Sequence, residues 1–84
     1  MTQLTPASLA LFKSLADDAP NWSGTPPCWV SAADRGNLTD LKKKGLLETM
    51  VDERGDAFAF FSRAGVALAA ELGFDLSWVP LADG

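Results

Sequence analysis

The chain has 84 residues, of which 48% are hydrophobic and 21% are charged, so it has the size and composition of one small globular domain, residues 1–84. With one cysteine and no histidine, it can form neither an internal disulfide nor a Cys/His zinc site, and it lacks the base of a Ser-His-Asp or Cys-His catalytic group. Its net charge of −4 argues against a non-specific nucleic-acid binder, because such proteins are usually basic.

The sequence also bears on localisation. It contains no run of about 18 apolar residues that could span a bilayer, and its N-terminal residues lack the basic flank of a signal peptide. A lone Cys28 suits a reducing compartment. We therefore expect a cytoplasmic protein with no membrane association.

The first predicted element is a helix that begins at Thr5-Pro6 and ends near Asp17-Asp18. Thr5 can cap this helix, and Pro6 at the first helical position loses no hydrogen bond. The 3.6-residue period predicts one buried stripe, formed by Leu9, Phe12, Leu15 and Ala16. Residues 19–28 read as a loop, and a short strand beside a later hairpin is expected at Trp29-Val30.

The next helical stretch is predicted to start at Ser31, which forms a capping box with Asp34. Gly36 leaves two alternatives open. Either one helix runs from about 32 to 44, or a short helical turn ends at Arg35-Gly36 and Asn37 caps a second helix, as in a helix-turn-helix.

Which charged side chains of this helix are exposed depends on which residues face inward. At 100° per residue, Leu38, Leu41 and Gly45 define the buried face, with Leu46 following them inward. The opposite face then carries Gly36, Thr39, Asp40 and Lys43, flanked by Arg35 and Lys44. Thr39 can contact a thymine methyl, Lys43 a guanine or a phosphate, and Asn37 an adenine. The simpler interpretation, that Lys42–Lys44 only complement the dipole of a helix C-terminus, stays open.

A β-hairpin and a third helix are predicted to follow. Residues 46–51 and 57–61 read as strands, joined by a loop that contains Gly55. Ser62 can cap a helix that ends at Gly73 and buries Val66, Leu68, Ala69 and Leu72. Phe58, Phe60 and Phe61 cannot all face one side of a strand, so at least one lies on the second face. Residues 74–84 form an apolar C-terminal tail.

Two motifs resemble a known family. The pattern Leu38-x-x-Leu41-x-x-x-Gly45-Leu46-Leu47 resembles the helix-to-wing junction of winged helix-turn-helix DNA-binding domains, and Phe61-Ser62-x-x-Gly65 resembles their junction between strand and last helix. The resemblance covers about residues 5 to 73 and is nearest to small MarR-like or phage-type transcriptional regulators. It implies an α+β fold, a small winged helix-turn-helix with three helical stretches and a β-hairpin wing in the C-terminal half.

The resemblance also implies a function. In that family the recognition helix enters the major groove of double-stranded DNA, and the wing tip meets the backbone or the minor groove. Carried onto this sequence, the first role falls to Arg35, Asn37, Thr39, Lys42 and Lys43, and the second to Arg54. The implied protein is a transcriptional regulator that forms a homodimer on two half-sites, with the apolar tail or the first helix as the dimer surface.

A second hypothesis comes from a different class. The predicted wing tip, residues 52–56, is net acidic and would oppose phosphate, which favours an acidic winged-helix protein-interaction module, phage-type or accessory, that does not bind DNA. Tryptophans of small domains usually pack in the core, but the interface candidates are Trp22, Trp78 and Leu81. Under either hypothesis no catalytic residue, metal site or cofactor is expected, because the sequence has no nucleophile–base pair, phosphate-binding glycine loop or metal-ligand spacing.

Overall fold

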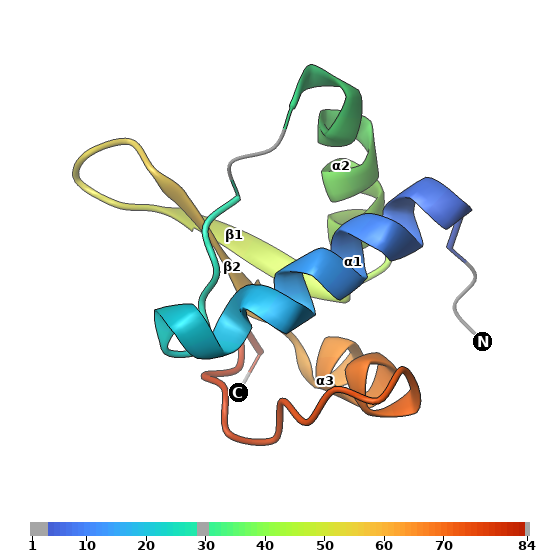
Figure 1. Ribbon diagram of the computed structural model, residues 1–84. Helices are drawn as coiled ribbons and strands as arrows, with labels where there is room; N and C mark the ends of the chain where they lie inside the picture. The colour runs from blue at the N-terminus through green and yellow to red at the C-terminus, as the bar shows by residue number, and fades with distance from the viewer. Residues whose placement is uncertain (1–3, 29–30, 84) are drawn as a thin grey trace.

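The computed structural model describes residues 4–28 and 31–83 (Figure 1). Within them, three α-helices and a two-stranded antiparallel sheet form a small α+β fold, as the sequence predicts. The elements are α1 (Pro6–Asp18), α2 (Arg35–Lys43), β1 (Leu47–Val51), β2 (Ala57–Phe61) and α3 (Arg63–Glu71), with 3₁₀ turns η1 (Ala19–Trp22) and η2 (Ala32–Asp34). No helix in this part of the chain is long and apolar enough to cross a membrane.

Helix α1 begins as its sequence predicts. The Thr5 side chain accepts a hydrogen bond from the Ser8 N–H at 3.1 Å, and Pro6 occupies the first turn. The buried stripe is rotated from the expected one, because Ser8 is buried and Leu9 is only half-buried. Ser8 can be buried because its hydroxyl finds a partner on α2, described below.

The segment after α1 differs in part from the predicted loop. Ala19–Trp22 form the 3₁₀ turn η1, which tolerates its proline in the first turn and ends at Ser23 in a left-handed conformation (φ 56°). The strand expected at Trp29-Val30 lies outside the described residues. Pairing beside the hairpin does occur just before them, where the Cys28 N–H donates to the Ala57 carbonyl at 2.8 Å.

The second helical stretch follows the first of the two alternatives. Turn η2 leads into α2 without a break, and Gly36 lies inside the helix rather than in a turn. The capping-box prediction is wrong, because the Ser31 side chain makes no capping hydrogen bond. The Asp34 carboxylate instead accepts a hydrogen bond from the Asn37 amide at 3.0 Å.

The two strands match the predicted ones to within one residue. Their register pairs Leu47 with Phe61 at the base of the hairpin and Val51 with Ala57 near its tip. The base is part of the core: the Phe61 ring meets the Phe12 ring of α1 edge-on, with 5.8 Å between centroids. The core residues are Phe12, Leu15, Ala16, Ala19, Cys28, Leu41, Leu46, Leu47, Ala59, Phe61, Ala69, Leu76 and Val79.

Two glycine-containing junctions fix the helices to the hairpin. Gly45 ends α2 with φ 72°, and the Leu46 N–H reaches back to the Leu41 carbonyl at 3.1 Å. At the other junction Ser62 caps α3 by accepting from the Gly65 N–H, and its hydroxyl donates to the Gly45 carbonyl. The two junctions therefore hold each other in place.

The C-terminal tail returns to the body of the molecule and passes below α3 in the view of Figure 1. Leu76 and Val79 are buried, and the Ala82 N–H donates to the Phe61 carbonyl at 2.9 Å. The Asp83 carboxylate accepts from the Arg63 N–H at 3.0 Å. The tail is thus part of the fold, and only some of its apolar side chains remain outside.

Candidate nucleic-acid interface on helix α2

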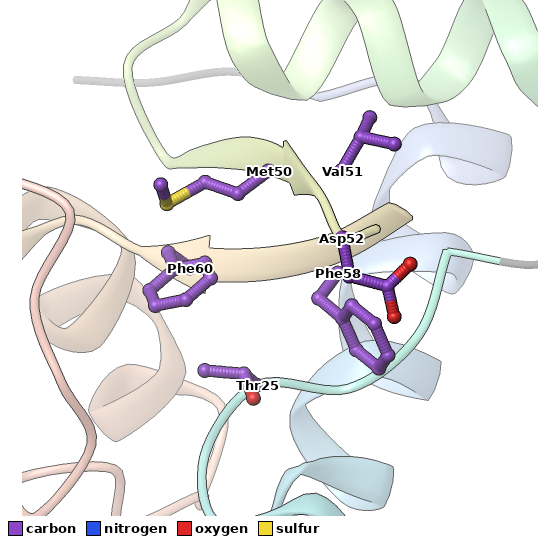
Figure 2. Close-up of a pocket in the computed structure, with 6 residues that line it drawn as sticks. All are labelled: Thr25, Met50, Val51, Asp52, Phe58 and Phe60. Atoms are coloured by element: carbon purple, nitrogen blue, oxygen red, sulfur yellow. The ribbon is translucent and has the colours of Figure 1, made fainter. Parts of the chain in front are cut away.

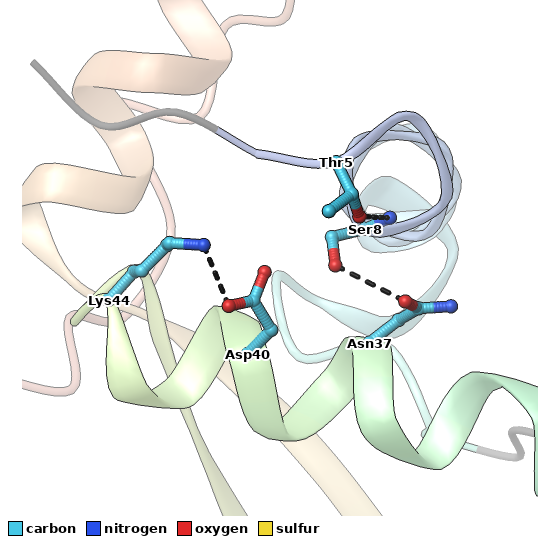
Figure 3. A network of polar contacts seen from close by, with 5 residues as sticks. All are labelled: Thr5, Ser8, Asn37, Asp40 and Lys44. Carbon is cyan, nitrogen blue, oxygen red and sulfur yellow. Dashed lines mark hydrogen bonds and ion pairs between the residues drawn. The ribbon is translucent and has the colours of Figure 1, made fainter.

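One face of α2 is closed by α1. Leu41 is fully buried there, and Asn37 is half-buried beside it. The Asn37 side-chain oxygen accepts a hydrogen bond from the Ser8 hydroxyl at 3.3 Å (Figure 3). The Asn37 amide group donates to the Asp34 carboxylate. Both ends of this amide are engaged, so the structure places Asn37 apart from the other residues of the expected DNA-binding set.

Asp40 lies at the edge of the same closed face. Its expected position on the outward face is wrong: its carboxylate is turned toward Lys44, whose ammonium lies 2.7 Å away, and it is half-buried (Figure 3). The hydrogen bond from Lys44 lowers the pKa of the Asp40 carboxyl below its ordinary value. The Ser8 hydroxyl is near enough to lower this pKa further, although the hydrogen bond it donates goes to Asn37.

The outward face of α2 is basic. Arg35, Lys42 and Lys43 are all exposed, and none has a carboxylate within 4.0 Å among the described residues. Thr39 is exposed between them, with its hydroxyl donating to the Arg35 carbonyl at 3.0 Å. Because Asp40 and Lys44 neutralise each other to one side, the outward face carries three positive charges and no negative one.

The tip of the hairpin is built from its own acidic residues. The Asp52 carboxylate accepts hydrogen bonds from the backbone N–H groups of Arg54 at 2.9 Å and of Asp56 at 3.0 Å. Gly55 completes the turn with φ 86°. Arg54 is exposed, but the tip projects well away from α2 (Figure 1). The structure therefore does not bring Arg54 together with the basic face of α2.

The three candidate interface residues lie in two places. The Trp22 side chain is 38% exposed, and its ring packs against Phe58 with 6.4 Å between centroids. Trp78 is 48% exposed in the tail, where its indole N–H donates to the Asp75 carbonyl at 2.9 Å. Leu81, also in the tail, is partly exposed. These side chains do not form one surface in common with α2.

The sequence analysis missed an apolar hollow on the hairpin. Its volume is about 250 Å³, and it is lined by Thr25, Met50, Val51, Asp52, Phe58 and Phe60 (Figure 2). Alternation along β2 predicts at least one phenylalanine on the second face; the structure has Phe58 and Phe60 there, both half-buried. Met50 beside them is largely exposed. Met50 on β1 and Phe58 and Phe60 on β2 lie on the same face of the hairpin. Alternation along the two predicted strands is the signal that could have revealed this hollow.

Reactive groups are scarce in the part of the chain that the structure describes. It contains no group of three or more His, Cys, Asp or Glu side chains that could hold a metal ion. Burial raises the pKa of the Cys28 thiol, an effect that the nearby charge of Lys42 opposes more weakly. A buried thiol with a raised pKa is a poor nucleophile, so this cysteine serves as a core side chain.

The geometry thus offers a basic helix face and, separately, an apolar hollow with acidic surroundings. The first can contact phosphates and base edges; the second can receive apolar side chains. In comparisons with known proteins, no protein-family model, no curated protein and no solved structure matches the chain.

Proposed function

We propose that the protein is a small, cytoplasmic DNA-binding regulator of the winged-helix type, with the outward face of α2 as its recognition surface. The observation that carries the proposal is the charge separation on this helix. Arg35, Lys42 and Lys43 are exposed and have no carboxylate partner among residues 4–28 and 31–83, while Asp40 is turned aside to Lys44. A helix face with this arrangement attracts the phosphate backbone, because the nearest carboxylate is hydrogen-bonded to Lys44.

The dimensions of α2 suit the major groove. Its nine residues span about 13.5 Å along the axis. The diameter of an α-helix with its side chains, about 10–12 Å, fits the major groove of B-DNA, which is about 12 Å wide. Arg35 lies at one end of the helix and Lys42 and Lys43 at the other, so they can reach phosphates on either side of the groove. Thr39, between them, is the residue placed to contact a base edge.

The order of the backbone segments supports the winged-helix interpretation. Residues 26–28 pair with β2, and β2 pairs with β1, so the paired segments lie side by side in the order 26–28, β2, β1. Helix α2 leads directly into β1 through Gly45. The acidic tip of the hairpin would be repelled by phosphate, so the proposal assigns DNA contact to α2 and leaves the tip outside the interface.

The first test is binding to DNA at several salt concentrations. A fluorescently labelled duplex, taken from a pool of random sequences, is titrated with the protein, and fluorescence anisotropy gives the affinity. Three phosphate contacts predict that the logarithm of the affinity falls with the logarithm of salt concentration with a slope of about −3 per subunit. An absence of binding at low salt contradicts the proposal.

The second test distinguishes the contribution of α2 to DNA binding from that of the overall charge. Lys43→Gln should weaken binding several-fold and make the salt slope shallower by about 1. Lys13→Gln on α1 is the matched control, because it removes the same charge from an exposed site on another helix. Equal losses from the two variants would show that only net charge matters and would contradict a recognition role for α2.

One contact of a single short helix with DNA is weak, and a homodimer that spans two half-sites would strengthen it. Trp78 and Leu81, which are exposed in the tail, are candidates for a dimer contact. Light scattering with and without the duplex measures the number of subunits on the DNA.

A further inference from the structure

The two outer edges of the hairpin differ. On β2, the backbone groups that point away from β1 belong to Ala57, Ala59 and Phe61, and each of these residues has a partner: Cys28 N–H donates to Ala57, Ala59 N–H donates to Pro26, and Ala82 N–H donates to Phe61, at 2.8–2.9 Å. The loop before α2 and the C-terminal tail together close this edge.

The edge of β1 is open. The hydrogen bonds from Ser62 N–H to the Leu46 carbonyl and from Asp52 N–H to the Asp56 carbonyl fix which residues of β1 face β2. By alternation, the N–H and C=O groups of Thr49 and Val51 face the other way. No described residue is hydrogen-bonded to them there. Leu47 is fully buried, so the open stretch consists of Thr49 and Val51.

The open edge lacks several of the features that protect such edges. β1 contains no proline, lysine or arginine, and its register with β2 runs without a bulge from one end to the other. Val51 is 67% exposed and Met50 58% exposed. Next to Met50, on the same face of the hairpin, lies the hollow formed with Phe58, Phe60 and Thr25, while Val51 points to the other side (Figure 2).

The charged side chains on β1 and at its end are negative, and the tip beyond them carries Arg54 between Glu53 and Asp56. Glu48 and Asp52 lie two residues before and two residues after Met50, so alternation places them on the same face of the strand. Both are exposed, and Glu53 and Asp56 follow at the tip. A strand added at this edge therefore meets a carboxylate, an apolar side chain and a second carboxylate in alternate positions.

We propose that the open edge of β1 binds an extended segment of a partner protein as an added antiparallel strand. The segment carries an apolar side chain opposite Met50 and a lysine or arginine two residues away on each side, opposite Glu48 and Asp52. Its backbone pairs with the free N–H and C=O groups of Thr49 and Val51. This site is separate from the basic face of α2 and does not depend on DNA binding.

A second copy of this chain fits the edge poorly. If two β1 strands paired through Thr49 and Val51, Met50 would face Met50 and each Glu48 would face the other copy's Asp52. Like charges directly opposite each other across a strand pair are destabilising. Each chain also carries a net charge of −4. The same charges favour a partner segment whose cations lie opposite the carboxylates of Glu48 and Asp52.

The test uses displayed peptides and the whole protein. A library of nine-residue peptides with five randomised central positions is selected against the immobilised chain. We expect enrichment of an apolar residue at the centre and of Lys or Arg two positions to either side. The same selection is then run on Glu48→Lys, which should change the preference at one flanking position from Lys or Arg to Asp or Glu. Glu71→Lys on α3, with the same charge change at an exposed site, should leave the preference unchanged.

A selected peptide then tests the backbone pairing without any change to the protein. N-methylation at the positions opposite Thr49 or Val51 removes an N–H that faces β1, and binding should weaken about tenfold or more. N-methylation opposite Met50 removes an N–H that faces away, and binding should be unchanged.

Three results would overturn the proposal. The first is a library in which no pattern is enriched. The second is an enriched pattern that Glu48→Lys does not alter, or whose peptides bind equally well when N-methylated at any position. The third is self-association of the protein that Thr49→Pro or Val51→Lys abolishes, because this would make a second copy the occupant of the edge.

Discussion

The base and the distal half of the hairpin have the same secondary structure but opposite surroundings. At the base, Leu47 and Phe61 are fully buried, and the turns into and out of the hairpin are hydrogen-bonded to each other through Ser62. In the distal half, Met50 and Val51 are largely exposed. The base therefore secures the fold, whereas the distal half can change without unfolding the chain. Substitutions at the two ends should therefore have very different effects.

The largest effect is expected at the base from Gly65→Ala. A Cβ atom at this position would lie 2.0 Å from the Leu46 carbonyl oxygen, and backbone cannot move aside as a flexible side chain can. We expect a loss of about 3 kcal/mol or more in the free energy of unfolding, measured by urea denaturation. Gly36→Ala is the control: nothing lies within 4 Å of its added Cβ, and it should stabilise α2 by up to about 1 kcal/mol. Similar stabilities for the two variants would show that the base is not tightly packed.

The next effect is expected from Ser62→Ala. This change removes both the cap that accepts from Gly65 N–H and the donor to the Gly45 carbonyl, so a loss of about 2 kcal/mol is expected. Thr5→Ala removes one comparable cap at the start of α1, where the site is exposed, and should cost about 1 kcal/mol. If Thr5→Ala proved the more damaging in thermal unfolding, the link between the two junctions would contribute little.

A smaller effect is expected from pH, at the end of α2 that leads into the hairpin. The pKa of Asp40 is lowered in the folded state by Lys44, so the folded protein holds its charged form more tightly than the unfolded chain does. The stability this provides is present above the unfolded pKa and is lost as the pH falls through the folded one, below about pH 4. Melting temperatures of the protein and of Asp40→Asn, followed by circular dichroism, should therefore converge on acidification. A difference that stays constant down to pH 2.5 would contradict the ion pair's role.

The smallest effect is expected in the distal half. Val51→Lys places a charge on an exposed side chain at the open edge and should change the free energy of unfolding by less than about 0.5 kcal/mol. It should nevertheless abolish binding of the selected peptides, because a lysine at an edge strand opposes the addition of another strand. A loss of stability comparable to that of Ser62→Ala would remove the distinction between base and distal half.

The parts of the fold that sequence predicts well depend on local chemistry. Thr5 and Ser62 cap their helices because a side-chain oxygen reaches an N–H three residues on, and Gly45 ends α2 because glycine adopts positive φ readily. The hairpin is likewise predicted by alternation and by its turn residues. Such features need no knowledge of distant residues.

The parts that sequence misses depend on partners far away in the chain. Asp40 was expected to face outward, but α1 brings Ser8, 32 positions earlier in the sequence, to that side of α2. The ion pair of Asp40 with Lys44, four residues on, is by contrast local and follows from helical spacing. The hydrogen bond from the Ser8 hydroxyl to the Asn37 side chain likewise explains why Asn37 is half-buried. The open edge of β1 could not be predicted from the sequence either, because it can be recognised only once the residues that close the edge of β2 are known.

The closure of β2 by the segment before α2 and by the tail has a consequence for assembly. A sheet with two free edges can be extended from both sides, and repeated addition then produces filaments. Here each chain has one free edge, so each chain can take up one strand directly. Copies of this chain cannot link through both edges into a continuous sheet, however concentrated the protein becomes.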